Sequence, residues 1–330
     1  MRMKKRYIVF GALTVVCLVL ALVFGGVRKN VIKENVRDFA AETYRGQAAM
    51  RYSQLAAYLT EEDYLTPDGM MGIKNSLEAA MTEASIESGY LLCGSSERNV
   101  VLTREALTVE AVATVYFGDW FGLHPHLPIE GGYVDENAVS TDFCVIDDLA
   151  AWRIFGSTDV CGMELSINDK LYTVSAVLAA DRSTYAPYYG EKPRVYILYS
   201  SAAMRDARIT FTSLEAVLPD PITDSAKTMF SEAVASYSED VTVITDRFTV
   251  PALWRIIKRL PELGVMEGKQ FPYYENVARI METKSAFLLI FEGAFYLLTS
   301  VFFVTLTVLI FYPLHGRLQE KRLAKKRHAF

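Results

Sequence analysis

Residues Ala286–Leu314 read AFLLIFEGAFYLLTSVFFVTLTVLIFYPL and are apolar almost throughout. Glu292 is the only charged residue in this segment. A helix of about 20 residues crosses the hydrocarbon core of a bilayer, and a run of roughly 18 or more apolar residues indicates a spanning helix. The alternative is a core helix of a soluble protein, but such a helix is rarely this long and apolar on every face. The segment therefore predicts a membrane-spanning helix.

A second apolar segment lies near the N-terminus. Tyr7–Val27 carries no charge and again has about the length of a bilayer-spanning helix. A cleaved signal peptide is the alternative, but its apolar run is usually about 7–15 residues and ends at a small-x-small cleavage site. Phe24–Val27 offers no such site. An uncleaved anchor is therefore the preferred interpretation.

Basic residues flank the two apolar segments. Residues 1–6 hold four Lys or Arg, and residues 315–330 hold six. Such clusters stay on the cytoplasmic side, so both termini are predicted to be cytoplasmic in a plasma-membrane protein with two spans. Arg28, Lys29 and Lys33 lie just outside the first span and argue against this orientation, but the clusters at the ends outnumber them.

The part of the chain between the basic ends is acidic. Residues 7–314 carry 24 basic and 38 acidic residues, a net charge of −14, whereas the whole chain carries −5. Nucleic-acid binding needs clustered Lys and Arg against phosphates. We therefore expect the lipid bilayer, and no nucleic acid, as a partner.

The sequence divides into seven parts. These are a cytoplasmic basic N-terminus (1–6), a first transmembrane helix (7–27), a helical stalk (28–60), an extracytoplasmic domain (61–273), a helix leading into the second span (274–285), a second transmembrane helix (286–314) and a cytoplasmic basic tail (315–330). In the stalk, apolar residues recur at three- and four-residue steps, which predicts one continuous helix. This helix is either a stalk that packs on its neighbour or a rigid lever joined to the first span.

Alternating helix and strand signals predict an α+β fold, a mixed sheet with helices, for the extracytoplasmic domain. Thr66-Pro67 predicts a helix start with a capping hydroxyl, and Ser95–Arg98 predicts a polar turn. The expected strands are Tyr90–Cys93, Asn99–Leu102, Leu107–Phe117, Arg194–Tyr199, Ala207–Val217 and Val241–Thr245, and the expected later helices are Thr223–Tyr237 and Val250–Leu260. The exposed side of the last helix is predicted to include Arg255, Lys258 and Arg259.

The segment Asp142–Asp181 carries the strongest local signals in this domain. Asp147 is predicted to cap a helix that follows a short strand and ends at Gly156. The helix is expected to bury Leu149, Ala150, Trp152 and Phe155, and the next elements are strand Glu164–Ile167, hairpin turn Asn168–Lys170 and strand Leu171–Leu178. Asp147, Asp148 and Asp159 could form a carboxylate site, but cap and turn chemistry accounts for all three.

The sequence predicts no catalytic site and no bound cofactor. It contains no Gly-x4-Gly-Lys-Ser/Thr loop for ATP and no Ser/His/Asp or Cys/His set. His124 and His126 could suggest a metal, but two histidines without further ligands favour a loop turn. Cys93, Cys144 and Cys161 are too few for a disulfide framework; a Cys144–Cys161 bridge and buried free thiols both remain open.

The Asp142–Asp181 pattern resembles the MacB-like periplasmic core domain of MacB/FtsX-type ABC transporter permeases. The matching positions include Phe155, Gly156, Gly162, Val174 and Val177, whereas Ala176 stands where the family usually has glycine. The flanking runs Pro128–Gly132 and Pro272–Arg279 resemble those that flank the core domain in the family.

This resemblance implies a non-catalytic membrane subunit of a transport or mechanotransmission complex. An ABC ATPase subunit would bind ATP, and its motion would be relayed to the extracytoplasmic domain. Family permeases usually have four spans, so this two-span form implies a second permease-like membrane subunit or a homo-oligomer. The alternative is a membrane-anchored sensor or scaffold that binds a peptide, a lipid or a cell-wall component.

Seven residues are candidates for partner contact or coupling. They are Glu292 in the second span, Arg317, Lys321 and Arg322 in the tail, and Tyr185, Tyr188 and Tyr189 in an aromatic loop. Charged groups within a membrane are functional candidates. Glu292 lies only two turns into the span, so an interfacial or packing role is the preferred alternative to coupling.

Overall fold

The computed structural model describes residues 2–47, 49–60, 64–134, 142–182, 192–201, 209–259 and 271–327. The chain divides into two compact units. Met1–Glu34, Phe248–Leu260 and Met281–Phe330 form the first, which we call the helical unit. Asn35–Arg247 and Pro261–Ile280 form the second, which we call the sheet unit.

The helical unit contains two long helices, α1 (Arg2–Glu34) and α8 (Tyr273–Arg327), and the short helix α7 (Val250–Arg259). The first turns of α8, up to Ile280, belong to the sheet unit. Both long helices have the length and composition needed to cross a membrane. Only 17% of the most apolar part of α1 and 0% of that of α8 is buried within the protein, unlike the core helix of a soluble domain. The predicted spans 7–27 and 286–314 lie within these helices.

The prediction of one helix from residue 28 to residue 60 is wrong beyond Glu34. The chain continues as a short 3-10 helix η1 (Val36–Phe39), helix α2 (Ala40–Arg45) and strand β1 (Tyr52–Tyr58). All seven residues of β1 are buried, because β1 is an interior strand of the sheet that is covered on both faces. A strand buried on both faces has no alternating pattern, so its apolar spacing matched a helix by chance. The sheet therefore begins at Tyr52, before the predicted domain boundary at residue 61.

The sheet unit is built around one mixed sheet, which confirms the predicted α+β class. Its strand order is β10-β1-β9-β2-β3-β8-β5-β7-β4, and β6 pairs with both β2 and β7. The strands are β2 (Leu91–Arg104), β3 (Leu107–Gly118), β4 (Pro128–Gly131), β5 (Phe143–Asp147), β6 (Glu164–Ile167), β7 (Lys170–Leu178), β8 (Arg194–Leu198), β9 (Ser213–Pro219) and β10 (Thr242–Val243).

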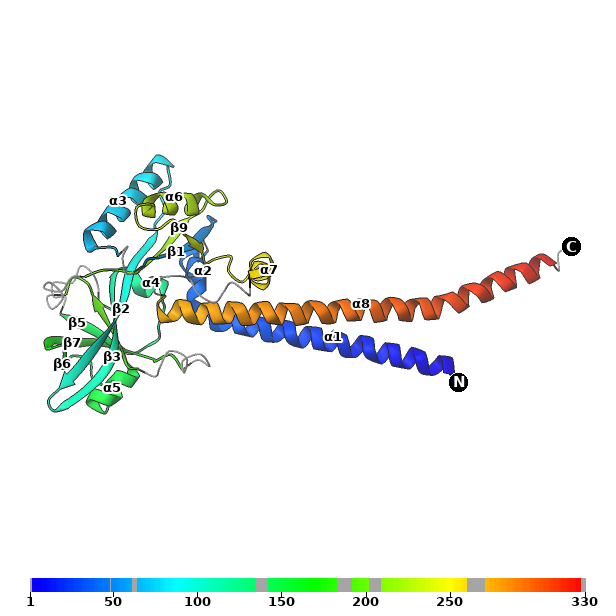
Figure 1. The fold of residues 1–330 in the computed structure, drawn as a ribbon, viewed down its shortest axis with the longest axis horizontal. Coiled ribbons are helices and arrows are strands. Elements are labelled where there is room, and N and C mark those ends of the chain that lie inside the picture. Colours follow the sequence, from blue (N-terminus) through cyan, green and yellow to red (C-terminus); the bar gives the residue numbers. More distant parts are fainter. Residues whose placement is uncertain are drawn as a thin grey trace. The chain divides into compact units, whose positions relative to one another are not determined.

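Six of these strands close into a barrel. The pairs β2·β3, β3·β8, β8·β5, β5·β7, β7·β6 and β6·β2 form an unbroken ring. Helix α5 (Asp148–Phe155) contributes Ala150, Ala151 and Ile154 to the same buried apolar cluster. Figure 1 shows α5 beside the barrel strands. We call this part of the sheet unit the barrel.

The other end of the sheet, β10-β1-β9-β2, is open and is covered on one face by two helices. These are α3 (Pro67–Glu83) and α6 (Ser225–Val234), which lie together over β1 and β9 in Figure 1. Met70 and Ile73 of α3 and Phe230 of α6 pack with Leu55 of β1 and Leu214 of β9. We call this part the open sheet.

Several local predictions are confirmed. The Thr66 side chain caps α3 by accepting a hydrogen bond from the backbone N–H of Gly69 at 3.2 Å. Asp147 caps α5 through the N–H of Ala150 at 2.7 Å, and α5 ends at Gly156 in the left-handed conformation. Only glycine adopts that conformation without steric cost.

Two local predictions are wrong, one about side-chain burial and one about a turn. The helix α5 was expected to bury Trp152, but Trp152 is 59% exposed and Ile154 is buried instead. Ser95–Arg98 was expected to form a turn, but these residues lie in the middle of β2 and pair with β3. Two of these polar side chains have buried partners: Ser95 lies 3.4 Å from the Tyr274 hydroxyl, and Glu97 accepts from Arg194 at 2.9 Å.

Candidate functional site

One face of the open sheet is polar, and this face lies opposite α3 and α6. Side chains alternate between the two faces of a strand. In β9, Leu214 joins the apolar cluster with α3 and α6, whereas Ser213 and Glu215 lie on the other face. Tyr58 of β1 and Ser95 of β2 pair with Ser213 and lie on the same polar face.

The guanidinium of Arg247 joins two buried carboxylates on this face. It donates to Glu275 at 2.8 and 2.7 Å and to Asp38 at 3.2 Å. The side chains of Arg247, Asp38 and Glu275 are 3%, 8% and 2% exposed. Glu275 also accepts from the Tyr58 hydroxyl and from Arg279, each at 2.9 Å. One terminal nitrogen of Arg247, Nη2, contacts both oxygens of Glu275, and the other, Nη1, contacts Asp38, so the planar guanidinium holds the two carboxylates in a fixed relation.

Burial places Asp38 under electrostatic strain. The pKa of the Asp38 carboxyl is raised to about 6, chiefly by burial; the nearby Glu275 contributes to the rise, and Arg247 opposes it. Asn35 donates to the same carboxylate at 2.9 Å. Removing Arg247 would therefore leave two carboxylates buried without their common cation.

A second group of buried polar side chains surrounds Glu215. Its carboxylate accepts from the Tyr274 hydroxyl at 2.5 Å and contacts Nε2 of His124 at 3.1 Å. Burial by itself raises the pKa of Glu215, but His124 and Tyr274 outweigh it, so the pKa lies below its usual value. The Tyr274 hydroxyl is also within 3.1 Å of Ser213 and 3.4 Å of Ser95.

A third group holds Tyr273 between two arginines. The guanidinium carbons of Arg194 and Arg37 lie 3.4 and 4.8 Å from the centre of the Tyr273 ring. Arg37 also donates to the Tyr273 hydroxyl at 2.5 Å. Glu97 accepts from Arg194 at 2.9 Å and from the Tyr273 backbone at 3.3 Å. Glu97 lies in the segment that was predicted to be a turn.

His126 lies beside this third group. It is within 3.4 Å of Arg37 and 3.3 Å of the Tyr196 hydroxyl. The pKa of His126 is lowered to about 3, chiefly by burial and in part by the nearby Arg37. The ring is therefore neutral near pH 7.

All three groups lie within the sheet unit. We call them together the polar junction: Arg37, Asp38, Glu97, His124, Arg194, Glu215, Arg247, Tyr273, Tyr274 and Glu275. Asp38 follows the end of α1 by four residues, and Glu275 is in the first turn of α8. Arg247 is itself three residues before the start of α7. The chain segments that adjoin α1, α7 and α8 are thus all bound to the sheet through the polar junction.

The polar junction is a network of mutually paired buried groups. Its carboxylates and guanidiniums are engaged with one another, and in the part of the chain described here no three His, Cys, Asp or Glu side chains gather as metal ligands. Low dielectric strengthens such a network and makes each broken pair expensive. The arrangement therefore resists relative displacement of its members.

Within the helical unit, a charged pair links α1 and α8. Arg28 donates to Glu292 at 2.9 Å, and the two side chains are only 13% and 16% exposed. Gly25 permits the close approach, since a Cβ there would lie 2.9 Å from a Glu292 oxygen. Phe24 stacks on Phe291 and Phe295 with ring centres 5.4 and 5.6 Å apart.

A second contact between α1 and α8 lies toward their other ends. Pro313 has no N–H, so the carbonyl of Leu309 loses its helical hydrogen bond. The Tyr7 hydroxyl donates to this carbonyl at 3.1 Å. In a bilayer, where water cannot satisfy a free carbonyl, this contact fixes the register of the two helices.

The predicted core-motif residues all lie in the barrel. Gly162 adopts a positive φ of 83° and donates its N–H to Val174 at 2.8 Å. Val174 and Val177 are both buried in the barrel cluster although they are three residues apart. A bulge in the pairing of β5 with β7 leaves Ser175 without a paired residue in β5, so that the side chain of Val177 again points into the barrel. Phe155 packs against the same cluster.

The predicted contact residues are only partly described by the structure. Glu292 pairs with Arg28, which the sequence analysis had counted only as evidence on orientation. Arg317, Lys321 and Arg322 lie within α8, and Tyr185, Tyr188 and Tyr189 lie outside the described residues. The four cysteines are free thiols, and burial raises the pKa of Cys144 well above its usual value.

Sequence reasoning missed the polar junction. The run Pro272–Arg279 was noted, and the polar residues Ser95–Arg98 inside an apolar strand pattern were a usable signal. Arg247 gave no local signal, because its partner Asp38 lies 209 positions away.

No family model matches the chain, and no curated protein matches it. Three solved structures are similar to parts of it. The extracellular domain of the noncanonic ABC-type transporter YknZ from Gram-positive bacteria matches 58% of this chain and 99% of its own, at 12% identity and a TM-score of 0.43. The periplasmic region of MacB from Actinobacillus actinomycetemcomitans matches 68% and 99%, at 14% identity and a TM-score of 0.45.

The third structure is a domain of a putative permease protein from Porphyromonas gingivalis, which matches 58% of this chain and 87% of its own, at 13% identity and a TM-score of 0.33. MacB is a member of the family that the sequence pattern resembles, and the other two proteins are described as a transporter and a permease. Since every TM-score is below 0.5, we transfer no residue's role from these proteins to this chain.

Proposed function

We propose that this chain is a non-catalytic membrane subunit of a MacB/FtsX-like ABC transport or mechanotransmission complex. In this proposal α1 and α8 cross the plasma membrane, both termini are cytoplasmic, and the sheet unit is extracytoplasmic. The observation that carries the proposal is Arg247, which holds the residues next to α1, α7 and α8 in one buried network with the sheet.

The network is suited to relaying a displacement. Separating Arg247 from Asp38 would leave an unpaired charge at a buried site, which costs about 3–5 kcal/mol. A shift of α1 or α8 would therefore move the open sheet with it rather than be absorbed at the connection. Gln54 of β1 strengthens this link, because its side chain donates to the backbone of Arg37 at 3.1 Å.

In the membrane, we propose Glu292 as a coupling residue through its pair with Arg28. An ion pair in a largely apolar helix pair holds the two spans in one register. Motion would enter at the cytoplasmic side, where Arg317, Lys321 and Arg322 would contact the ATPase subunit. That subunit would bind ATP, and a second permease-like subunit or further copies of this chain would complete the membrane part.

The test is the ATPase activity of the complex that copurifies with the full chain in mild detergent. We expect an ATPase and a permease-like partner to be recovered. Arg247→Met should retain these partners but change the ATPase rate. Arg247→Lys keeps the charge but lacks the two terminal nitrogens that contact Asp38 and Glu275, and it should show a smaller change.

The matched control is Leu102→Ala in the barrel, a fully buried apolar residue outside the polar junction. It should lower the stability of the sheet unit by a similar amount and leave the ATPase rate unchanged. Equal changes in the ATPase rate for Arg247→Met and Leu102→Ala would contradict the proposal that the polar junction relays motion. Recovery of neither an ATPase nor a permease-like partner would favour the alternative, a membrane-anchored sensor or scaffold.

A further inference from the structure

Helix α7 has the composition of a helix that lies on a membrane surface. Its ten residues, VPALWRIIKR, include three basic residues and no acidic residue. Surface-bound helices combine Lys and Arg on one face with Trp, Leu and similar residues on the other. No role in the polar junction or in either predicted span accounts for this composition.

The basic residues of α7 lie beside its apolar face and opposite to it. At 100° per residue, Val250, Leu253, Trp254 and Ile257 fall on one side and Arg255 falls on the other, while Lys258 lies next to Trp254 at the edge of the apolar side. Leu253 is completely buried and attaches the helix to the protein. Val250 and Trp254 remain 54% and 52% exposed. The apolar face is thus only partly covered, and its uncovered edge carries the tryptophan.

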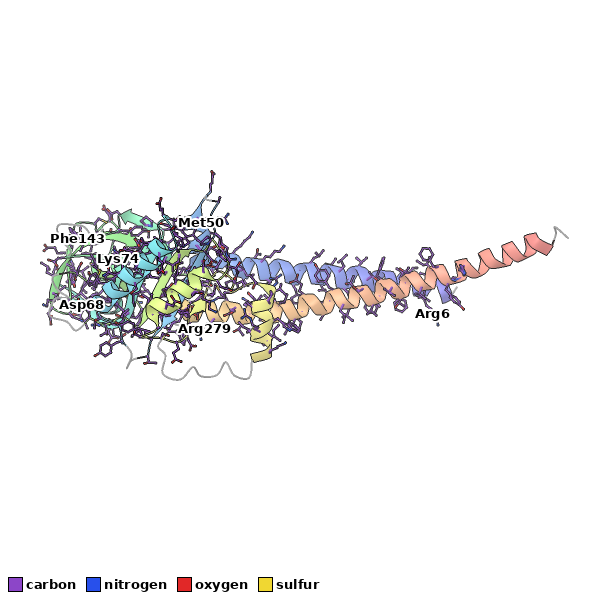
Figure 2. The ribbon with its side chains drawn as sticks, turned by 90° about the horizontal axis from the view of Figure 1, so that it is seen from above. Arg6, Met50, Asp68, Lys74, Phe143 and Arg279 are labelled. Atoms are coloured by element: carbon purple, nitrogen blue, oxygen red, sulfur yellow. The ribbon has the colours of Figure 1, made fainter. Side chains whose placement is uncertain are left out.

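The position of α7 matches its composition. It belongs to the helical unit together with the membrane-crossing parts of α1 and α8. Figures 1 and 2 together show α7 lying crosswise to α8 and beside the first half of that helix. If α8 crosses a bilayer, a helix in this direction lies along the membrane surface. The predicted span begins at Ala286, which is in the same half of α8.

We infer that α7 binds the headgroup layer of the outer leaflet and that its ligand is anionic phospholipid. Trp254 and Val250 enter the boundary between headgroups and acyl chains, where tryptophan is favoured. Arg255 and Lys258 contact the phosphates, and each basic residue near an anionic surface adds to the attraction. The inference needs α1 and α8 to cross the membrane, but it does not need them to relay motion.

The experiment uses the fluorescence of the full chain in vesicles of phosphatidylcholine brominated near the headgroup, with or without phosphatidylglycerol. The chain has three tryptophans, which simplifies the measurement. Trp120 is buried in the sheet unit, and Trp152, at 59% exposed, is as accessible as Trp254 but lies on α5. Trp152→Phe is therefore the matched control for Trp254→Phe.

We expect the brominated lipid to quench the wild type and Trp152→Phe, and Trp254→Phe to lose most of the quenchable emission. Arg255→Gln combined with Lys258→Gln should reduce quenching several-fold more in vesicles with phosphatidylglycerol than in those without it. Unchanged quenching in Trp254→Phe would overturn the inference. The inference would also be overturned if aqueous acrylamide, but not brominated lipid, quenched Trp254 in the wild type. That outcome would assign the exposed face of α7 to a protein partner. An equal effect of the double variant in both vesicles would overturn the preference for anionic lipid.

Discussion

The barrel and the open sheet share strand β2, yet they are stabilised in different ways. The barrel surrounds one apolar cluster to which all six strands and α5 contribute. The open sheet has an apolar face under α3 and α6 and an opposite face on which arginines, carboxylates and tyrosines are buried together. An apolar core tolerates small rearrangements, whereas a network of buried charges is favourable in one geometry only.

This difference separates residues that stabilise the fold of the barrel from residues that hold neighbouring segments against the open sheet. The barrel residues Phe155, Gly156, Gly162, Val174 and Val177 secure a fold. The polar junction secures the connections of the sheet to the segments that lead to α1, α7 and α8. We therefore expect changes in the barrel to lower stability without altering the connection, and changes in the polar junction to do both.

The largest effect is expected from Arg247→Met. Removing the guanidinium leaves Asp38 buried without a cation and Glu275 paired with Arg279 alone, which should destabilise the sheet unit by about 4 kcal/mol. Hydrogen exchange of the full chain in detergent should show lost protection in β1, β9 and the first turn of α8. Retained protection there, with loss confined to the barrel, would contradict the assigned role of Arg247.

Leu102→Ala should come next. This side chain is fully buried in the barrel, and its truncation leaves a cavity that should destabilise the protein by about 3 kcal/mol. Hydrogen exchange should then increase in β2, β6 and α5, while the first turn of α8 stays protected. A loss of protection that reached Tyr273–Glu275 first would mean that the two regions are not separate in stability.

A pair of tyrosine variants compares single hydrogen bonds in the two regions. Tyr58 donates to the Glu275 carboxylate, whereas the Tyr172 hydroxyl lies 3.2 Å from the neutral Ser201 hydroxyl. Because bonds to charged groups are stronger, Tyr58→Phe should lower the free energy of unfolding by about 2 kcal/mol and Tyr172→Phe by about 1 kcal/mol. The denaturant midpoints of both variants measure the difference. Equal losses would show that the Glu275 network adds nothing beyond ordinary hydrogen bonding.

The smallest effect is a pH dependence that belongs to Asp38. Its pKa is raised from 3.8 to about 6 in the folded protein, chiefly by burial. A carboxyl with a raised folded pKa contributes stability that is fully present below its unfolded pKa and is lost as the pH rises through about 6. The Tm of the wild type minus that of Asp38→Asn should therefore increase as the pH is lowered from about 8 to about 5.

His126, with its lowered pKa, is present in both proteins of this comparison, so its contribution cancels in the difference. A flat difference would show that Arg247 holds Asp38 ionised throughout this range. A difference that decreased on acidification would mean that the pKa of Asp38 is lowered rather than raised. Either result would assign Asp38 to an ordinary ion pair.

The sequence by itself determined the elements that depend on neighbouring residues. The apolar runs at Tyr7–Val27 and Ala286–Leu314 indicated two long helices, and the caps at Thr66 and Asp147 indicated the starts of α3 and α5. The turn at Asn168–Lys170 marked the hairpin of β6 and β7, because its left-handed residues Asn168 and Asp169 have the short polar side chains that this conformation favours. Each of these signals acts over a few residues, so a sequence pattern contains it completely.

Only the tertiary structure decided the rest. Tyr52–Tyr58 has the apolar spacing of a helix but becomes an interior strand, because β9 and β10 satisfy its backbone on both sides. Ser95 and Glu97 have the polarity of a turn but remain in β2, since Tyr274 and Arg194 supply their partners. Asp38, Arg247 and Glu275 are far apart in the sequence and are brought together by the tertiary fold. Buried polar groups require partners, and those partners come from distant parts of the chain that no local pattern records.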